Sequence, residues 1–266
     1  MSNSQPNSAP SCQDPSGFRE VGRSTKDEAN YRAQLDHYAM GSAGTAVEKF
    51  ENFPKYITRQ SIARYLALYE IFKMILPIQG DIIEGGVNWG GGLMWFAQMS
   101  AALEPFNLQR RIIGFDTFSG FPELHSNDIE HAEAGKEHRE GGYQANSFDD
   151  LTECVQLYDQ NRPIGHVPKV RLIRGDACQT MPQYLVDNPH TIVSLLHLDF
   201  DIYSPTQVAI ETFLHRMPKG AVILFDELNC PKWPGETQAV IESLDIRETR
   251  IQRFAFEPYI SYAVLE

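Results

Sequence analysis

Apolar and polar residues follow one another along this chain in a pattern that predicts alternating strands and helices. Short runs that are almost wholly apolar recur, as strands buried on both faces of a parallel sheet require. Between these runs lie segments with apolar residues at the three- and four-residue spacing of a helix. The expected strands are 81–87, 111–117, 170–175, 192–199, 221–226, 250–256 and 260–265, and the expected helices between them are 91–103, 147–160, 180–186, 205–215 and 236–244.

The order of these elements indicates the fold class. Strands that alternate with helices predict an α/β fold with a doubly wound, Rossmann-like sheet. The last two strands are joined only by Glu257, Pro258 and Tyr259. So short a link permits a hairpin and excludes a helical crossover. The prediction is a mostly parallel sheet that ends in an antiparallel hairpin.

The first 80 residues precede the alternating pattern. Residues 1–22 are polar and read as a disordered leader. Residues 25–40 are helix-like and polar, whereas residues 58–76 carry a helical pattern of apolar positions. We therefore expect a leader over 1–22, a helical cap over 23–80 and a catalytic domain over 81–266.

Composition narrows the class of protein. The chain has 266 residues, 42% of them hydrophobic, which is enough for one sizeable core. Its net charge of −12 makes nucleic acid an unfavourable partner. The chain has no apolar run of roughly 18 residues, no signal-peptide pattern and no two cysteines at CxxC spacing. A cytoplasmic enzyme without a membrane span, disulfide framework or zinc site is expected.

The turn after the first strand, within IIEGGVNWGGG, is rich in glycine. It lacks the GxGxxG pattern of dinucleotide-binding proteins, because Val87 stands where the second glycine should fall. Glu84 would repel a pyrophosphate but could accept hydrogen bonds from an ammonium group, which favours an amino-acid-like ligand. A plain glycine-rich turn is the alternative. The residues assigned to this ligand are Glu84, Gly85, Gly86, Val87, Gly90 and Gly91.

The second strand ends in Asp116, followed by Thr117 and Phe118. Ligands of open α/β sheets bind at the carboxyl ends of the strands, where an acid after the second strand is placed to bind ribose hydroxyls. Phe118 is a candidate for stacking on a base. We therefore expect all three residues to contact a nucleoside.

The third strand leads into Gly175, Asp176 and Ala177. Asp176 is placed to accept a hydrogen bond from an adenine amine, with Ala177 leaving room for the ring. Any one such acid is weak evidence, because aspartate often caps the helix that follows a strand. Glu84, Asp116 and Asp176 in order on three strands together describe adenosine with an amino-acid tail. S-adenosyl-L-methionine is the expected ligand.

Four further acids follow the fourth and fifth strands: Asp199, Asp201, Asp226 and Glu227. If those strands are neighbours beside the first strand, the acids converge next to the expected methyl donor. Clustered carboxylates repel one another unless a cation or a proton intervenes, and such oxygens suit Mg²⁺ or another divalent cation. We hypothesise that Asp199, Asp226 and Glu227 hold a metal. Helix capping is the alternative for Asp201 in particular.

The stretches IIEGGVNWGGG, IIGFDTFSGFPE, LLHLDFDIYSPT and GAVILFDELN together resemble the macrocin O-methyltransferase family of class I S-adenosylmethionine-dependent methyltransferases, over residues 53–266. The resemblance implies a seven-stranded sheet and O-methylation of a sugar, on a nucleotide-activated deoxyhexose or a glycosylated natural product. It also implies Mg²⁺ at Asp199, Asp226 and Glu227, and assembly into homodimers or higher homo-oligomers. Many relatives have two aspartates where this chain has Asp226 and Glu227.

The expected reaction is methyl transfer to a sugar hydroxyl, which a bound cation would make more acidic. Asp199 would hold the cation and Asp201 would accept the proton. His197 is the other candidate base, but a histidine inside a strand is more typical of a packed core. The polar segment 125–142 predicts a lid or substrate loop, with a solvated insertion as the alternative.

Other functions compete with this interpretation. A nicotinamide-dependent oxidoreductase acting on sugar nucleotides shares the fold, but the glycine pattern and the acids after strands four and five disfavour it. Methyl transfer to an amino-sugar nitrogen is open. A non-catalytic scaffold has no need to gather like charges.

Overall fold

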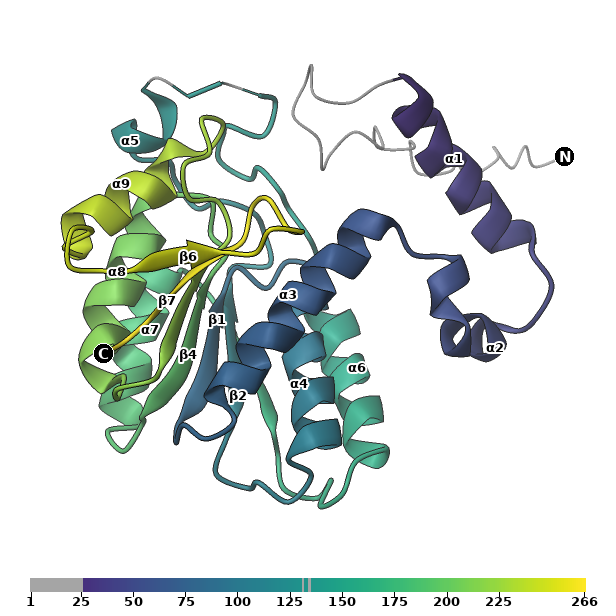
Figure 1. Cartoon of the computed structure of the whole chain (residues 1–266), viewed down its shortest axis with the longest axis horizontal. Helices are drawn as coiled ribbons and strands as arrows, with labels where there is room; N and C mark the ends of the chain where they lie inside the picture. The colour runs from purple at the N-terminus through teal and green to yellow at the C-terminus, as the bar shows by residue number, and fades with distance from the viewer. Residues whose placement is uncertain (1–25, 131, 134) are drawn as a thin grey trace, which may run out of the picture. The chain divides into compact units, whose positions relative to one another are not determined.

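The computed structural model describes residues 26–266 except 131 and 134 (Figure 1), so the leader predicted over 1–22 lies outside the described residues. The chain divides into two compact units, Met1–Arg59 and Gln60–Glu266. The described part of the first unit contains helical elements. They are α1 (Lys26–Gly41), α2 (Ala46–Glu51) and the 3₁₀ helix η1 (Phe53–Lys55). Thr45 begins α2 with a capping box that it forms with Glu48.

The second unit contains a seven-stranded sheet in the order β3-β2-β1-β4-β5-β7-β6. The first five strands are parallel, whereas β7 is antiparallel to both β5 and β6. This confirms the predicted fold class. The strands are β1 (Asp81–Gly85), β2 (Ile112–Asp116), β3 (Val170–Arg174), β4 (Val193–Leu198), β5 (Val222–Phe225), β6 (Ile251–Arg253) and β7 (Ser261–Val264).

Helices cover both faces of this sheet (Figure 1). Alternate residues of a strand point to opposite faces. Thus Ile82 packs with α3, α4 and α6, whereas Ile83 packs with α7, α8 and α9. The helices of the second unit are α3 (Arg59–Ile75), α4 (Gly91–Leu103), α5 (Ser126–Ile129), α6 (Phe148–Gln160), α7 (Ala177–Asp187), α8 (Tyr203–Phe213), η2 (Leu214–Arg216) and α9 (Pro234–Ser243).

The structure differs from the predicted boundaries in two places. The unit that contains the sheet begins at Gln60 rather than at residue 81, because α3 buries Leu68, Ile71 and Phe72 in the core beside the sheet. In addition, β6 ends at Arg253, so the link to β7 is longer than the three residues expected. Both differences arise from tertiary packing, which local patterns do not report.

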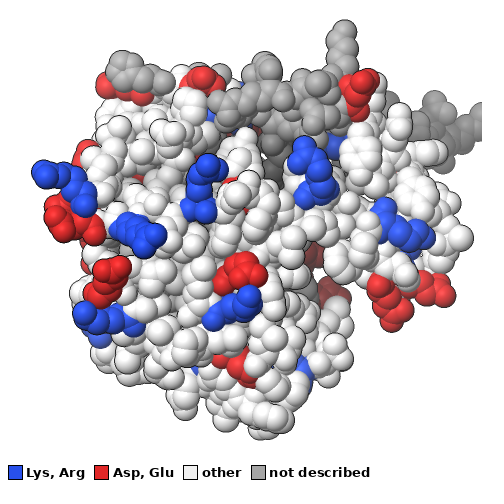
Figure 2. All heavy atoms as spheres, viewed as in Figure 1, with Lys and Arg blue, Asp and Glu red and all other residues white. Residues whose placement is uncertain are grey.

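The charges on the surface and the apolar character of the helices are relevant to binding of nucleic acid and of membranes. On the face drawn in Figure 2, basic and acidic side chains are interspersed, so this face offers a phosphate backbone no continuous basic area. Among the described residues, none of the helices has the length and apolar character needed to cross a membrane.

Candidate active site

The carboxyl ends of β1, β4 and β5 meet at one edge of the sheet. In register, Glu84 of β1 lies beside His197 of β4, and Leu198 of β4 lies beside Phe225 of β5. The residues that follow are held by the same ladder, since Asp199 N donates to Gly85 O at 3.0 Å and Asp226 N donates to Leu198 O at 3.1 Å. The two aspartates are therefore brought together beside the glycine turn.

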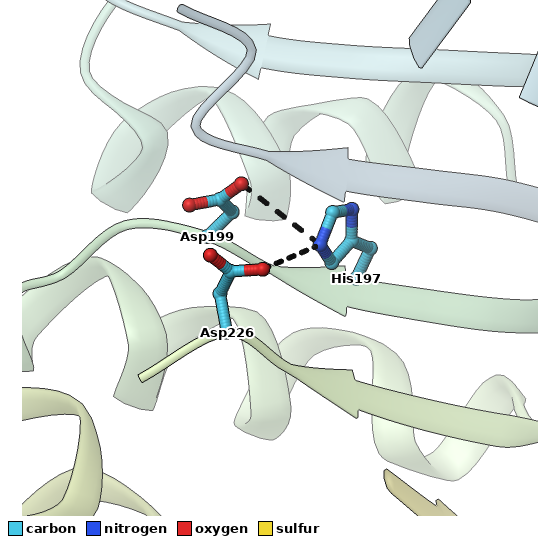
Figure 3. Close-up of side chains that lie close together, drawn as sticks. All are labelled: His197, Asp199 and Asp226. Atoms are coloured by element: carbon cyan, nitrogen blue, oxygen red, sulfur yellow. Dashed lines mark ion pairs between the residues drawn. The ribbon is translucent and has the colours of Figure 1, made fainter. Parts of the chain in front are cut away.

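His197 completes a compact group with these two aspartates (Figure 3). One potential ligand atom from each of the three residues lies within 4.8 Å of the others. His197 Nε2 is 3.7 Å from Asp226 Oδ1 and 4.0 Å from Asp199 Oδ2, and Nδ1 is 3.3 Å from Glu84 Oε2. Burial disfavours the charged ring, but the Asp226 and Glu84 carboxylates outweigh it and raise the pKa of His197 to about 10.

Arg64 of α3 also reaches this group. Its guanidinium donates to both oxygens of Asp226, at 2.5 and 2.8 Å, and to Asp199 Oδ2 at 2.7 Å. Burial works against ionisation of Asp226, yet the charges of Arg64 and His197 lower its pKa to about 2. Burial and the neighbouring Asp226 raise the pKa of Asp199 to about 7.

The sequence analysis did not identify Arg64, although the sequence carries a signal for it. Arg64 stands three, four and seven residues before Ala67, Leu68 and Ile71, which are all fully buried. An arginine on the buried face of a helix must find an acid.

Asp201 and Glu227 form a second acidic group. Their carboxyl groups interact with each other, and burial together with neighbouring carboxylates raises the pKa of each well above its usual range. Glu236 of α9 is fully buried beside them, and its Oε1 accepts a hydrogen bond from Glu227 N at 3.1 Å. Glu227 thus pairs with Asp201, outside the compact His197, Asp199 and Asp226 group, and its role as a metal ligand stays a prediction.

The capping alternative for Asp201 is wrong. The N-cap of α8 is Ile202, which makes no side-chain capping bond, and Tyr203 N instead donates to Asp128 Oδ1 at 2.7 Å. Both Asp199 and Asp201 lie beyond β4, which ends at Leu198. Asp201 takes a left-handed conformation with φ of 64°.

The turn after β1 packs closely against other parts of the chain, so there is little room for side chains at two of its glycines. Gly86 has φ of 83°, and a Cβ there would lie 1.8 Å from Asp199 O. Gly90 is the left-handed N-cap of α4, and a Cβ on it would strike Leu151. A Cβ on Gly91 would meet only Tyr65 Oη, at 3.3 Å.

Glu84 and Val87, which flank Gly85 and Gly86, are both buried. The Glu84 carboxylate lies against Gly92 and His197. The sequence pattern did not predict the contact with His197. The assignment of 84–87, Gly90 and Gly91 to the methyl donor stays a prediction.

Asp116 organises the next turn. Its Oδ2 accepts a hydrogen bond from Asn88 N at 2.8 Å, and its Oδ1 accepts one from Phe118 N at 2.6 Å. Thr117 donates its hydroxyl to Gly120 O at 2.6 Å. The Phe118 ring is 2% exposed and packs edge-on against Phe148. The ring is therefore already buried by other side chains, and its stacking on a base stays a prediction.

Asp176 caps α7, because its Oδ1 accepts a hydrogen bond from Cys178 N at 2.9 Å. The capping reading is therefore right for this residue, and the cap also begins α7 at Ala177, three residues earlier than predicted. Gly175 has φ of 143°, and Ala177 is 6% exposed. Contact of these three residues with adenine stays a prediction.

The segment 125–142 is tied to the rest of the second unit. Asp128 is fully buried and accepts hydrogen bonds from His125 N and Tyr203 N. The His138 ring stacks on Trp233 at 3.9 Å, and its Nε2 lies 2.7 Å from Lys232 O. These contacts contradict a merely solvated insertion, and they place the segment against the start of α9.

Comparisons with known proteins agree with this architecture. The family model described as macrocin-O-methyltransferase (TylF) matches residues 63–245. The solved structure of CalS11, a calicheamicin methyltransferase, is 30% identical, with a TM-score of 0.86 over 91% of this chain and 93% of that chain. The apo structure of CalS11, described as a TDP-rhamnose 3′-O-methyltransferase, is 30% identical, with a TM-score of 0.78 over 95% of this chain and 99% of that chain.

A curated protein of Streptomyces olivaceus is also similar. It is 8-demethyl-8-(2,3-dimethoxy-alpha-L-rhamnosyl)-tetracenomycin-C 4′-O-methyltransferase, and it is 26% identical over 155 residues, 56% of this chain. The match spans 53% of that protein, so the chain covers about half the length of this curated relative. The family model covers most of the chain, and its match contains β1 to β5 with the site between them. The chain therefore belongs to the macrocin-O-methyltransferase (TylF) family.

Proposed function

We propose that this protein transfers a methyl group from S-adenosyl-L-methionine to a hydroxyl of a sugar-containing small molecule. The observation that carries the proposal is the group of His197, Asp199 and Asp226 beside the glycine turn, in a chain of this family. The relatives support the acceptor class, since one is described as acting on TDP-rhamnose and another on a rhamnosyl tetracenomycin.

The donor would lie along the turns after β1, β2 and β3. Asp116 lies at the turn after β2, and each of its two carboxylate oxygens accepts a single backbone hydrogen bond. A carboxylate oxygen has a second lone pair for a ribose hydroxyl. This spare capacity supports the predicted contact with the donor.

The compact group has the chemistry of a divalent cation site. It offers two carboxylate oxygens, from Asp199 and Asp226, and the Arg64 guanidinium and the His197 ring already lie against them as positive charges. Asp199 and Asp226 would hold Mg²⁺ or another divalent cation, with His197 beside them. When bound, such a cation supplies positive charge that lowers the pKa of a nearby hydroxyl.

Asp201 is the proposed proton acceptor. Burial, and then the charges of Asp199 and Glu236, raise its pKa well above the usual range, which makes its carboxylate a stronger base than an exposed one. In the reaction the acceptor oxygen forms a bond to the methyl carbon as the carbon–sulfur bond breaks. The hydroxyl proton passes to Asp201, and S-adenosylhomocysteine leaves.

The test is methyl transfer from labelled donor to a panel of nucleotide-activated deoxyhexoses and rhamnosylated compounds, with the Asp199→Ala variant. We expect transfer by the wild type, loss of at least about a hundredfold in the variant, and nearly unchanged donor affinity by calorimetry. Asp187→Ala, at the exposed end of α7, is the matched control.

Three results would count against the proposal. Failure to bind the donor would refute it entirely. Donor binding without transfer to any sugar would refute the acceptor class. Activity that persists in Asp199→Ala or in excess chelator would remove the cation from the reaction.

A further inference from the structure

Arg64 is a charged residue on a helix face that otherwise packs into the core. It stands one and two turns before Leu68 and Ile71, whose side chains are fully buried. A charge at the edge of a core requires anionic partners, because burying it alone is costly. Its partners, Asp199 and Asp226, lie 135 and 162 residues further along the chain.

The guanidinium takes the same oxygens that the candidate cation site offers. Arg64 lies 2.7 Å from Asp199 Oδ2 and 2.5 Å from Asp226 Oδ1. These two oxygens are also the ones that face His197 Nε2, at 4.0 and 3.7 Å. A cation bound among the three residues would therefore lie against a guanidinium that already contacts two of them.

The two positive groups oppose each other. A divalent ion and a guanidinium that share two carboxylates repel, and the repulsion is strong where water is partly excluded. The Arg64 side chain is 30% exposed, so it has an open side toward which it can withdraw. Withdrawal leaves the carboxylates to the ion.

We propose that Arg64, together with His197, neutralises Asp199 and Asp226 until a divalent ion binds, and that the ion must displace the Arg64 guanidinium. This inference rests on the cation site of the proposed function. Arg64 is thereby a positioning residue, which keeps the two carboxylates together and lowers their affinity for metal.

Loss of the guanidinium then has two opposite effects. Without metal, the variant leaves two close carboxylates with His197 as their remaining positive partner, so it should unfold at a lower temperature than the wild type. With metal, the same site has lost its guanidinium competitor, so it should bind the ion more tightly and gain more stability from it. A residue that only packs α3 against the sheet would cause the first effect without the second.

The experiment compares the wild type with Arg64→Met, using Mn²⁺ alone, whose free form is measured by electron paramagnetic resonance. We expect the dissociation constant to fall at least about tenfold in Arg64→Met, and the metal-induced rise in Tm to be larger. Lys73→Met is the control, because it removes the same charge from the same helix but pairs with Glu70, away from the site. It should match the wild type.

Arg64→Lys is a second variant, which tests the same inference if the Arg64→Met protein fails to fold. Lysine keeps the charge but not the two-pronged guanidinium, so its Mn²⁺ affinity should lie above that of the wild type. Equal or weaker Mn²⁺ affinity in the folded Arg64 variants would overturn this inference and leave the cation site standing. Absence of Mn²⁺ binding in every protein would overturn both.

Discussion

The close approach of Gly86 to the backbone after β4 makes a quantitative prediction. In Gly86→Ala the new Cβ would lie 1.8 Å from Asp199 O and 2.6 Å from Asp199 C. Real Cβ contacts stay above 3.0 Å. The two chain segments must therefore separate by about 1.2 Å, the difference between 3.0 and 1.8 Å.

Two costs add in this variant. An alanine in a left-handed conformation, here at φ of 83°, costs about 1–2 kcal/mol. Forcing an extra carbon into a packed site costs about 1–3 kcal/mol more. The expected loss in the free energy of unfolding is thus about 2–5 kcal/mol.

Gly141 provides a matched control. It also has a positive φ, 71°, but a Cβ there would meet nothing within 4 Å. Gly141→Ala should therefore lose only the conformational cost of about 1–2 kcal/mol.

Urea unfolding followed by tryptophan fluorescence measures both variants, with the midpoint and the slope fitted separately. A loss in Gly86→Ala no larger than that in Gly141→Ala would refute the reasoning. It would mean that the Asp199 backbone can move aside at no cost.

Two further predictions concern the donor and a buried lysine. Asp116→Ala should weaken S-adenosylmethionine binding at least about tenfold by calorimetry, because a charged acceptor of ribose hydroxyls is lost; an unchanged affinity would contradict the ribose contact. Burial lowers the pKa of Lys169 to about 8, so between about pH 8 and 10.5 the unfolded chain binds more protons than the folded one. The free energy of unfolding should therefore rise with pH over that range, by up to about 1.4 kcal/mol per pH unit. Lys169→Met should lack this contribution. Parallel pH profiles of the free energy of unfolding for the two proteins would contradict the prediction.

Much of the fold was predictable from the sequence for local reasons. Apolar runs and helical spacing predicted every strand and most helices of the sheet unit, because burial imposes a period on each element. The order of the elements also predicted that acids after the fourth and fifth strands would gather at one edge. Asp199 and Asp226 do so, since parallel neighbours end at the same edge.

The tertiary structure alone decided which side chains pair within that edge. Glu227 lies with Asp201, His197 joins the two aspartates, and Arg64 reaches them from a helix assigned to a separate cap. The partners of Arg64 are 135 and 162 residues away, and no local pattern encodes such a pairing. Sequence periodicity reports which face of an element is buried, whereas contacts between charged groups depend on how those faces pack against one another.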